Sequence, residues 1–149
     1  MEFALDPGAV GKSLRWFDGQ QPSAVWRPID STRPYYLQVP GCYTADGMPY
    51  VGHMWYRCEL DVPAVPAGRQ VRLYSPAVSC EAWVWVNGQY AGYRKYLEAY
   101  IRPNELDLDV TALIKPGQKN SVSVWVSTGV NRTQAPEGFA GRILLFAPK

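Results

Sequence analysis

The sequence lacks the features that mark several large classes of protein. No run of Lys and Arg reaches five residues and the net charge is only +2, so the concentrated basic face that nucleic-acid binding needs is missing. No stretch of eighteen apolar residues occurs, which excludes a membrane-spanning helix. We therefore expect neither nucleic acid nor a membrane among the partners of this chain.

Histidine and cysteine are also scarce. His53 is the only histidine, so a metal cluster built on several histidines is excluded. The cysteines are Cys42, Cys58 and Cys80, an odd number without a Cys-x-x-Cys pair, and neither a zinc site nor a disulfide framework is indicated. Three buried thiols and one bridge with a spare thiol both fit this count. No cofactor is expected, and no signal peptide is visible at the start.

Aromatic and turn-forming residues, in contrast, are plentiful. Of the 149 residues, 47% are apolar and 19% charged, an ordinary balance for one globular domain. Trp, Tyr and Phe together number 20, and Gly and Pro number 13 each. Large rings with a polar edge suit a β-fold and a surface that meets sugars or another protein.

Apolar and polar residues alternate with period two along most of the chain. Runs of this kind cover residues 54–62, 71–74, 82–86, 106–110 and 122–126, and residues 143–146 form a last apolar run. Each run predicts a strand with one face on a core. Asn87-Gly88 predicts a tight hairpin turn, whereas no segment carries a sustained helical stripe. Many short strands with frequent turns indicate an all-β sandwich or barrel, and residues 1–50 predict an irregular N-terminal wrap that packs its rings on it.

The order of short motifs resembles the N-terminal sugar-binding domain of family 2 glycoside hydrolases, which include β-galactosidases and β-glucuronidases. The matching landmarks, in chain order, are Asp6-Pro7, Gly11, Trp16-Phe17, Trp26, Ile29, Val39-Pro40-Gly41, Tyr50, Gly52, Trp55-Tyr56-Arg57, Val62-Pro63, residues 84–88, Gly92, residues 109–111, Asn120 and residues 141–145. The Gly-Gly-Tyr-x-Pro-Phe segment that family members place after the Asn-Gly hairpin is replaced here by the more aromatic and basic residues 93–105.

This resemblance implies the fold and the setting of the chain. It implies one all-β jelly-roll sandwich of about eight strands, galactose-binding-domain-like, over residues 1–149, with the main strands at 54–147. It also implies that the chain is excised from a larger glycosidase, whose other domains are its partners together with carbohydrate. We expect that parent to be secreted or periplasmic.

Catalytic residues are not indicated within the chain. Glycoside hydrolysis needs two carboxyl groups across the scissile bond, and in this family they lie on a separate barrel of roughly 250 residues. The acidic residues here are scattered, and no Gly-x-Ser-x-Gly motif occurs. A structural calcium ion remains open as an alternative, and its candidate ligands are Asp61, Glu105, Asp107 and Asp109.

Three groups of residues are candidates for binding, each with packing within the chain as the alternative. The first group lies in two loops that in the family face the barrel or the sugar: Tyr43, Asp46, Tyr50, His53, Asn131, Arg132 and Glu137. The second surface comprises Tyr93, Tyr96, Tyr100 and Arg102, with Arg94 and Lys95 nearby. Trp83 and Trp125 lie opposite the Val face by alternation, so they are candidates for an interface with another domain.

The sequence thus favours a non-catalytic accessory domain that packs on a catalytic barrel and helps shape a carbohydrate cleft. A free-standing carbohydrate-binding module and a purely structural interaction sandwich are the alternatives, because a fold alone does not fix a function.

Overall fold

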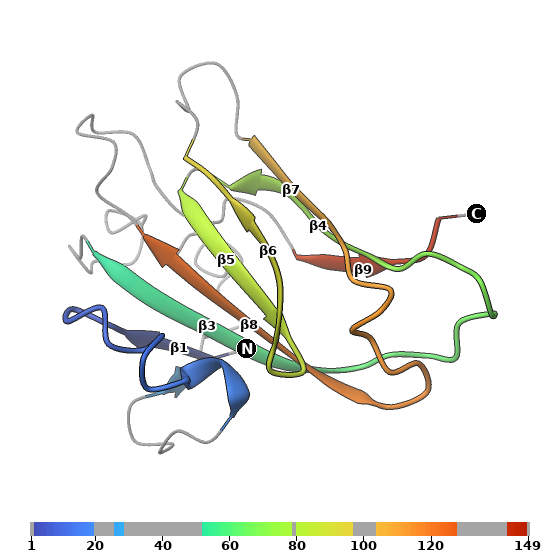
Figure 1. The fold of residues 1–149 in the computed structure, drawn as a ribbon, viewed down its shortest axis with the longest axis horizontal. Helices are drawn as coiled ribbons and strands as arrows, with labels where there is room; N and C mark the ends of the chain where they lie inside the picture. Colours follow the sequence, from blue (N-terminus) through green and yellow to red (C-terminus); the bar gives the residue numbers. More distant parts are fainter. Residues whose placement is uncertain are drawn as a thin grey trace.

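The computed structural model describes residues 2–19, 26–28, 52–78, 80–96, 104–127 and 143–148. Within these ranges the chain forms strands with a single short 3-10 helix, η1 (Trp16–Asp18). Figure 1 shows the strands gathered into two layers. No helix in the described part is long and apolar enough to cross a bilayer.

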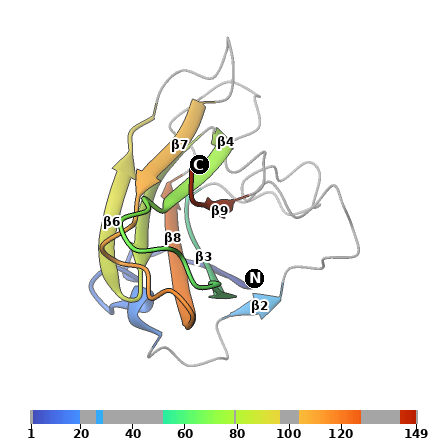
Figure 2. The same ribbon diagram turned by 90° about the vertical axis from the view of Figure 1, so that its right-hand side faces the viewer.

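The larger layer is a six-stranded antiparallel sheet. Its strands, in spatial order, are β2 (Arg27–Pro28), β1 (Glu2–Leu5), β3 (His53–Asp61), β8 (Lys119–Ser127), β5 (Glu81–Val86) and β6 (Gln89–Arg94). The smaller layer contains β7 (Asn104–Asp109), β4 (Arg72–Val78) and β9 (Leu144–Phe146). Figure 2 shows the small sheet across from the large one. The predicted all-β sandwich is confirmed.

The core between the sheets follows the alternation in the sequence. Val84, Val86, Val122, Val124 and Val126 all point inward from β5 and β8 and are buried. Leu73 and Leu106 meet them from the small sheet. Each buried aliphatic side chain contributes about 2 kcal/mol, so these two strands supply much of the stability. The Val face that the sequence predicted is therefore the interior of the sandwich.

The Asn87-Gly88 turn joins β5 to β6 as predicted. Asn87 has φ 52° and Gly88 has φ 75°, the two positive values that a type I′ hairpin requires. The Asn87 side chain also donates to Leu113 O and Asn120 Oδ1, both at 2.8 Å, and accepts from Ser121 N at 3.0 Å. The turn is thereby tied to β8 and to the loop before it.

The N-terminal wrap is more regular than predicted. Glu2–Leu5 forms β1, which pairs with β3 in the register Phe3 to Tyr56. Phe3 and Leu5 face the core, while Ala4 lies on the opposite face beneath Trp55. Four residues are too few for alternation to identify a strand, and this strand exists because β3 offers it a pairing edge.

The cysteines that the structure describes are not bridged to each other. Cys58 is a half-buried thiol on β3, and burial raises its pKa. Cys80 is buried beside β5. Cys42 lies outside the described residues.

Candidate binding surface

The outer face of the six-stranded sheet carries a second, aromatic core. Trp55, Trp85 and Trp125 project from β3, β5 and β8, away from the Val core. Trp16 and Phe17 of η1 and Trp26 pack on them, with the Phe17 and Trp85 rings stacked at 5.0 Å. The expectation that the N-terminal rings pack against the sandwich is confirmed for these residues.

A buried carboxylate, Asp6, holds the N-terminal segment on this face. Its Oδ1 accepts from Val10 N at 2.8 Å, and its Oδ2 accepts from Gly11 N at 2.9 Å. The same Oδ2 accepts from Trp55 Nε1 at 3.0 Å and from Trp125 Nε1 at 3.3 Å. Hydrogen bonds to a charged acceptor are the strong ones, so Asp6 joins residues 6–11 to the two central strands.

Four rings form a continuous row across four strands, which we call the aromatic row: His53, Trp125, Trp83 and Tyr93. The His53 and Trp125 rings stack at 4.6 Å, Trp125 and Trp83 meet at 4.4 Å, and Trp83 and Tyr93 at 4.6 Å. The sequence had placed these residues in three separate candidate groups. The structure brings them together because β3, β8, β5 and β6 are neighbours in one sheet.

The ammonium group of Lys12 lies over the centre of the aromatic row. Its Nζ is 3.7 Å from the centroid of Trp83 and 3.6 Å from that of Trp125. Such cation–π contacts are electrostatic attractions to the negative ring face. Burial lowers the pKa of Lys12, and the nearby Glu81 carboxylate opposes that shift. Lys12 thus holds the N-terminal segment against the aromatic row.

Tyr90 and Tyr93 display their rings at the β6 edge of the sheet. Tyr93 pairs with Trp83 and Tyr90 with Trp85, and the register shift between these pairs leaves Ala91 as an extra residue. This β-bulge allows Tyr90 and Tyr93, which are three positions apart in the sequence, to lie on the same face of the sheet. Tyr90 is 56% exposed and Tyr93 40% exposed, so this end of the row is open to solvent.

Glu81 fixes the Tyr93 side chain. The Tyr93 hydroxyl donates to Glu81 Oε1 at 2.5 Å. The hydrogen bond to Glu81, with some desolvation, raises the pKa of Tyr93 to about 12, because ionising the phenol would place two anions in contact. The phenol is therefore a neutral donor over the physiological range.

The predicted binding loops attach at one end of the six-stranded sheet. His53 at the start of β3 pairs with Ser127 at the end of β8, which also pairs with Glu81 at the start of β5. Arg94 at the end of β6 pairs with Ala82, and Figure 1 shows these four strand ends together. Most of the predicted loop residues themselves lie outside the described residues: Tyr43, Asp46, Tyr50, Tyr100, Arg102, Asn131, Arg132 and Glu137.

The two tryptophans proposed for a domain interface differ in exposure. Trp125 is only 6% exposed, because Lys12, His53 and Trp83 of the same chain cover it. Trp83 is half-buried, as is Tyr96 of the second candidate surface. An interface at these rings stays a prediction, and only Trp83 retains appreciable surface for it.

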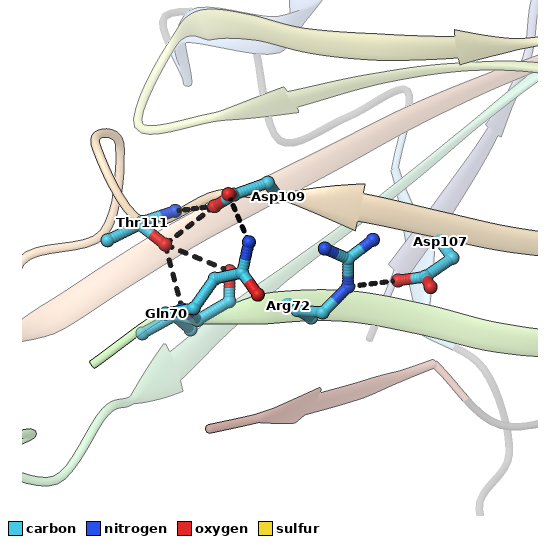
Figure 3. Close-up of polar contacts among 6 residues, drawn as sticks. Gln70, Arg72, Asp107, Asp109 and Thr111 are labelled. Atoms are coloured by element: carbon cyan, nitrogen blue, oxygen red, sulfur yellow. Dashed lines mark hydrogen bonds and ion pairs between the residues drawn. The ribbon is translucent and has the colours of Figure 1, made fainter. Parts of the chain in front are cut away.

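The acidic residues of β7 are engaged in hydrogen bonds and an ion pair (Figure 3). Asp107 accepts from Arg72 Nε at 2.7 Å. Asp109 accepts from Thr111 Oγ1 at 2.6 Å and from Gln70 Nε2 at 2.6 Å. The hydrogen bonds from Thr111 and then Gln70 lower the pKa of Asp109 to about 2.

The candidate calcium ligands do not converge on one point. Asp61 lies on β3 of the large sheet, whereas Glu105, Asp107 and Asp109 lie on β7 of the small one. In the described part of the chain, no three His, Cys, Asp or Glu side chains form a group that could hold a metal ion. These four carboxylates therefore do not form the calcium site that the sequence left open.

Arg94 contradicts the expectation of a surface residue. It is 7% exposed, and its Nη1 donates to Cys80 O at 2.5 Å. Its Nε and Nη2 atoms have no acceptor among the described residues, and burial lowers its pKa. The side chain faces inward because Arg94 pairs with the core residue Ala82.

Sequence reasoning missed Lys12, Glu81 and Tyr90 as parts of this surface. Alternation could have placed Tyr93 and Glu81 on the outer face of one hairpin, but the bulge at Ala91 that adds Tyr90 leaves no such signal. Lys12 comes from a segment without alternation, so only the folded chain shows which rings it covers.

The fold defines the chain as a domain-sized antiparallel β-sandwich whose outer face is partly covered by the N-terminal segment. No protein-family model matches it. A curated β-glucuronidase from Paenibacillus borealis is 28% identical over 141 residues, which are 91% of this chain and 21% of that protein. The crystal structure of Ruminococcus gnavus β-glucuronidase is similar with a TM-score of 0.66 and 23% identity, over 87% of this chain and 20% of that one.

A further structure of Ruminococcus gnavus β-glucuronidase is similar with a TM-score of 0.67 and 24% identity, covering 96% of this chain and 23% of that one. The resemblance to part of a family 2 glycoside hydrolase, expected from the order of the motifs, is thereby confirmed. The chain spans about a fifth of the length of the relatives it matches.

Proposed function

We propose that this chain is a non-catalytic accessory domain of a family 2-type glycoside hydrolase. It packs on a catalytic barrel and forms part of the wall of the carbohydrate cleft. The observation that carries this proposal is the unequal coverage of the two proteins in their alignment. The alignment includes 91% of this chain but only 21% of the β-glucuronidase. The remaining four fifths leave room for a barrel of roughly 250 residues.

The chemistry of the described carboxylates supports the non-catalytic part of the proposal. A glycosidase acid needs a raised pKa so that it carries a proton at neutral pH. Asp107 and Asp109 share one face of β7, but the pKa of Asp109 is lowered to about 2 and Asp107 is paired with Arg72. Asp6 is buried with four N–H donors on its two oxygens, out of reach of a substrate.

The end of the sheet where β3 begins at His53 and β8 ends at Ser127 is the proposed contact with the barrel. Both predicted binding loops connect there, since His53 and Ser127 are directly paired. Loops at one end of a rigid sandwich are the usual place for such contacts. The opposite end, by contrast, closes with the tight Asn87-Gly88 turn.

The proposal is tested on the gene that encodes these residues. We expect its reading frame to continue beyond codon 149 through a barrel-sized stretch, giving a polypeptide about five times this length, as in the curated relative. A stop codon directly after Lys149 would contradict the proposal and favour a free-standing binding module.

A complementation assay then tests whether the domain serves the enzyme. The polypeptide lacking residues 1–149 is assayed for hydrolysis of 4-nitrophenyl β-D-glucuronide, alone and after addition of the 149-residue chain. We expect activity to rise on addition of the chain and not on addition of the same chain after heat denaturation. Equal activity with and without the folded chain would argue against an accessory role.

A further inference from the structure

We propose that the outer face of the β5–β6 hairpin is an oligosaccharide-binding platform formed by Trp83, Tyr90, Tyr93, Glu81 and Lys12. We call this set the hairpin platform. It deepens the proposed function, on which it rests, because it names the surface of the domain that meets the glycan. Its ligand class is an oligosaccharide of pyranose sugars.

The first argument is the exposure of two large rings on one face. Tyr90 and Tyr93 are 56% and 40% exposed, although alternation in a regular strand would send residues three apart to opposite faces. The bulge at Ala91 places both beside Trp85 and Trp83 on the outer face. The β-bulge thus exposes the Tyr90 ring on the same face as the Tyr93 ring.

The second argument is that the rings are held before any ligand arrives. Tyr93 packs on Trp83 at 4.6 Å and donates to Glu81 at 2.5 Å, while Tyr90 meets the edge of Trp85 at 5.8 Å. Trp83 in turn is fixed by Trp125 at 4.4 Å and by the Lys12 ammonium at 3.7 Å. Binding to such a surface costs little side-chain entropy.

The third argument is the chemistry beside the rings. One face of a pyranose is lined with C–H groups, which pack on the negative face of an aromatic ring, and its rim carries hydroxyls. The Glu81 carboxylate has a second oxygen that can accept from such hydroxyls, and the Lys12 ammonium can donate to them. A protein partner would instead have to bury both charges, which is costly.

The spacing of the two tyrosines selects an oligosaccharide over a monosaccharide. The bulge sets Tyr90 and Tyr93 opposite Trp85 and Trp83, which are two residues apart on β5 and so about 7 Å apart along the strand. A single sugar ring therefore stacks fully on only one of the two side chains. A tetrasaccharide can stack on both at once, and its second contact is then intramolecular. Affinity should therefore rise with chain length.

Titration of the 15N-labelled 149-residue chain tests the platform. Cellotetraose and aldotetraouronic acid are the oligosaccharide probes, methyl β-D-glucoside is the monosaccharide, and the tryptophan indole N–H signals are followed by NMR. We expect saturable shifts with at least one tetrasaccharide, and weaker binding of the glucoside. Tyr90→Ala and Tyr93→Ala should each weaken tetrasaccharide binding about fivefold.

The matched control is Tyr74→Ala, since Tyr74 lies on β4 of the other sheet and meets Phe146 edge-on at 6.2 Å. This variant should bind as the wild type does. Tyr93→Phe, which keeps the ring and loses the bond to Glu81, should retain more affinity than Tyr93→Ala. Thermal melts of each variant show whether it is folded at the titration temperature.

Three results would overturn the platform. They are no saturable shift with either tetrasaccharide, unchanged binding by folded Tyr90→Ala and Tyr93→Ala variants, and an equal loss in Tyr74→Ala. None of them bears on complementation of the truncated polypeptide, so failure of the platform and failure of the accessory role are distinguishable.

Discussion

Gly11→Ala should destabilise the protein strongly, although it adds a single methyl group. A Cβ at residue 11 would lie 2.1 Å from Trp55 Nε1 and 2.8 Å from Asp6 Oδ2. Trp55 Nε1 donates a hydrogen bond to Asp6 Oδ2 at 3.0 Å, and this bond helps to hold the N-terminal segment on the sheet. If either side chain moves to make room for the methyl group, that hydrogen bond is weakened. The substitution therefore forces the segment away from the sheet or breaks the bonds to Asp6.

The size of the effect follows from the contacts at Asp6. Overpacking a tight site costs about 2 kcal/mol, and weakening a hydrogen bond to a buried carboxylate costs about 2 kcal/mol more. Alanine also restricts the unfolded chain, which returns about 0.7 kcal/mol. The net loss is about 3 kcal/mol, which in a domain of this size lowers the Tm by about 9 °C.

Gly8→Ala is the matched control for this prediction. The nearest atom to a Cβ at residue 8 is Val10 Cγ1 at 3.4 Å, and the site is exposed, so the change should stay within about 0.5 kcal/mol. Urea unfolding and calorimetry of both variants measure the difference. Equal stabilities for Gly11→Ala and Gly8→Ala would refute the role given to Asp6.

Three further predictions concern single side chains. Asn120→Ala should lower the free energy of unfolding in urea by about 3 kcal/mol, because this buried amide makes four hydrogen bonds at 2.8–2.9 Å. The control is Gln118→Ala at an exposed site nearby, which should lower it by less than about 0.5 kcal/mol. Glu81→Gln should bring the pKa of Tyr93 down from about 12, seen as earlier phenol ionisation in ultraviolet titration against Tyr93→Phe, and an unchanged titration would contradict the bond between them. Asp109 has a folded pKa of about 2, below its usual 3.8, so it stabilises the fold above the unfolded pKa and loses that contribution as pH falls through about 2. The difference in urea midpoint between wild type and Asp109→Asn should therefore shrink from pH 4 to pH 2, and a constant difference would count against the assignment.

The parts of the fold that the sequence predicted well depend on local periodicity. The alternation of Val84 and Val86 with Trp83 and Trp85 placed the valines inside and the tryptophans outside, and the structure has both where they were expected. Asn-Gly directly after this run predicted the hairpin, because few other pairs adopt two positive φ values.

The parts that the sequence did not predict depend on contacts between distant segments. Asp6 is joined to Trp125 across 119 positions, and nothing in the local pattern identifies that partner. Lys12 and the aromatic row meet for the same reason. The inward-facing Arg94 was missed because a charged residue at a strand end is normally on the surface.

The measurement that tests the central proposal most directly is hydrolysis of 4-nitrophenyl β-D-glucuronide by two purified proteins, the 149-residue chain and the full polypeptide encoded by its gene. A non-catalytic accessory domain predicts turnover by the full polypeptide and none above buffer by the chain. Turnover by the 149-residue chain alone, abolished by substitution of one of its own carboxylates, would contradict the proposal.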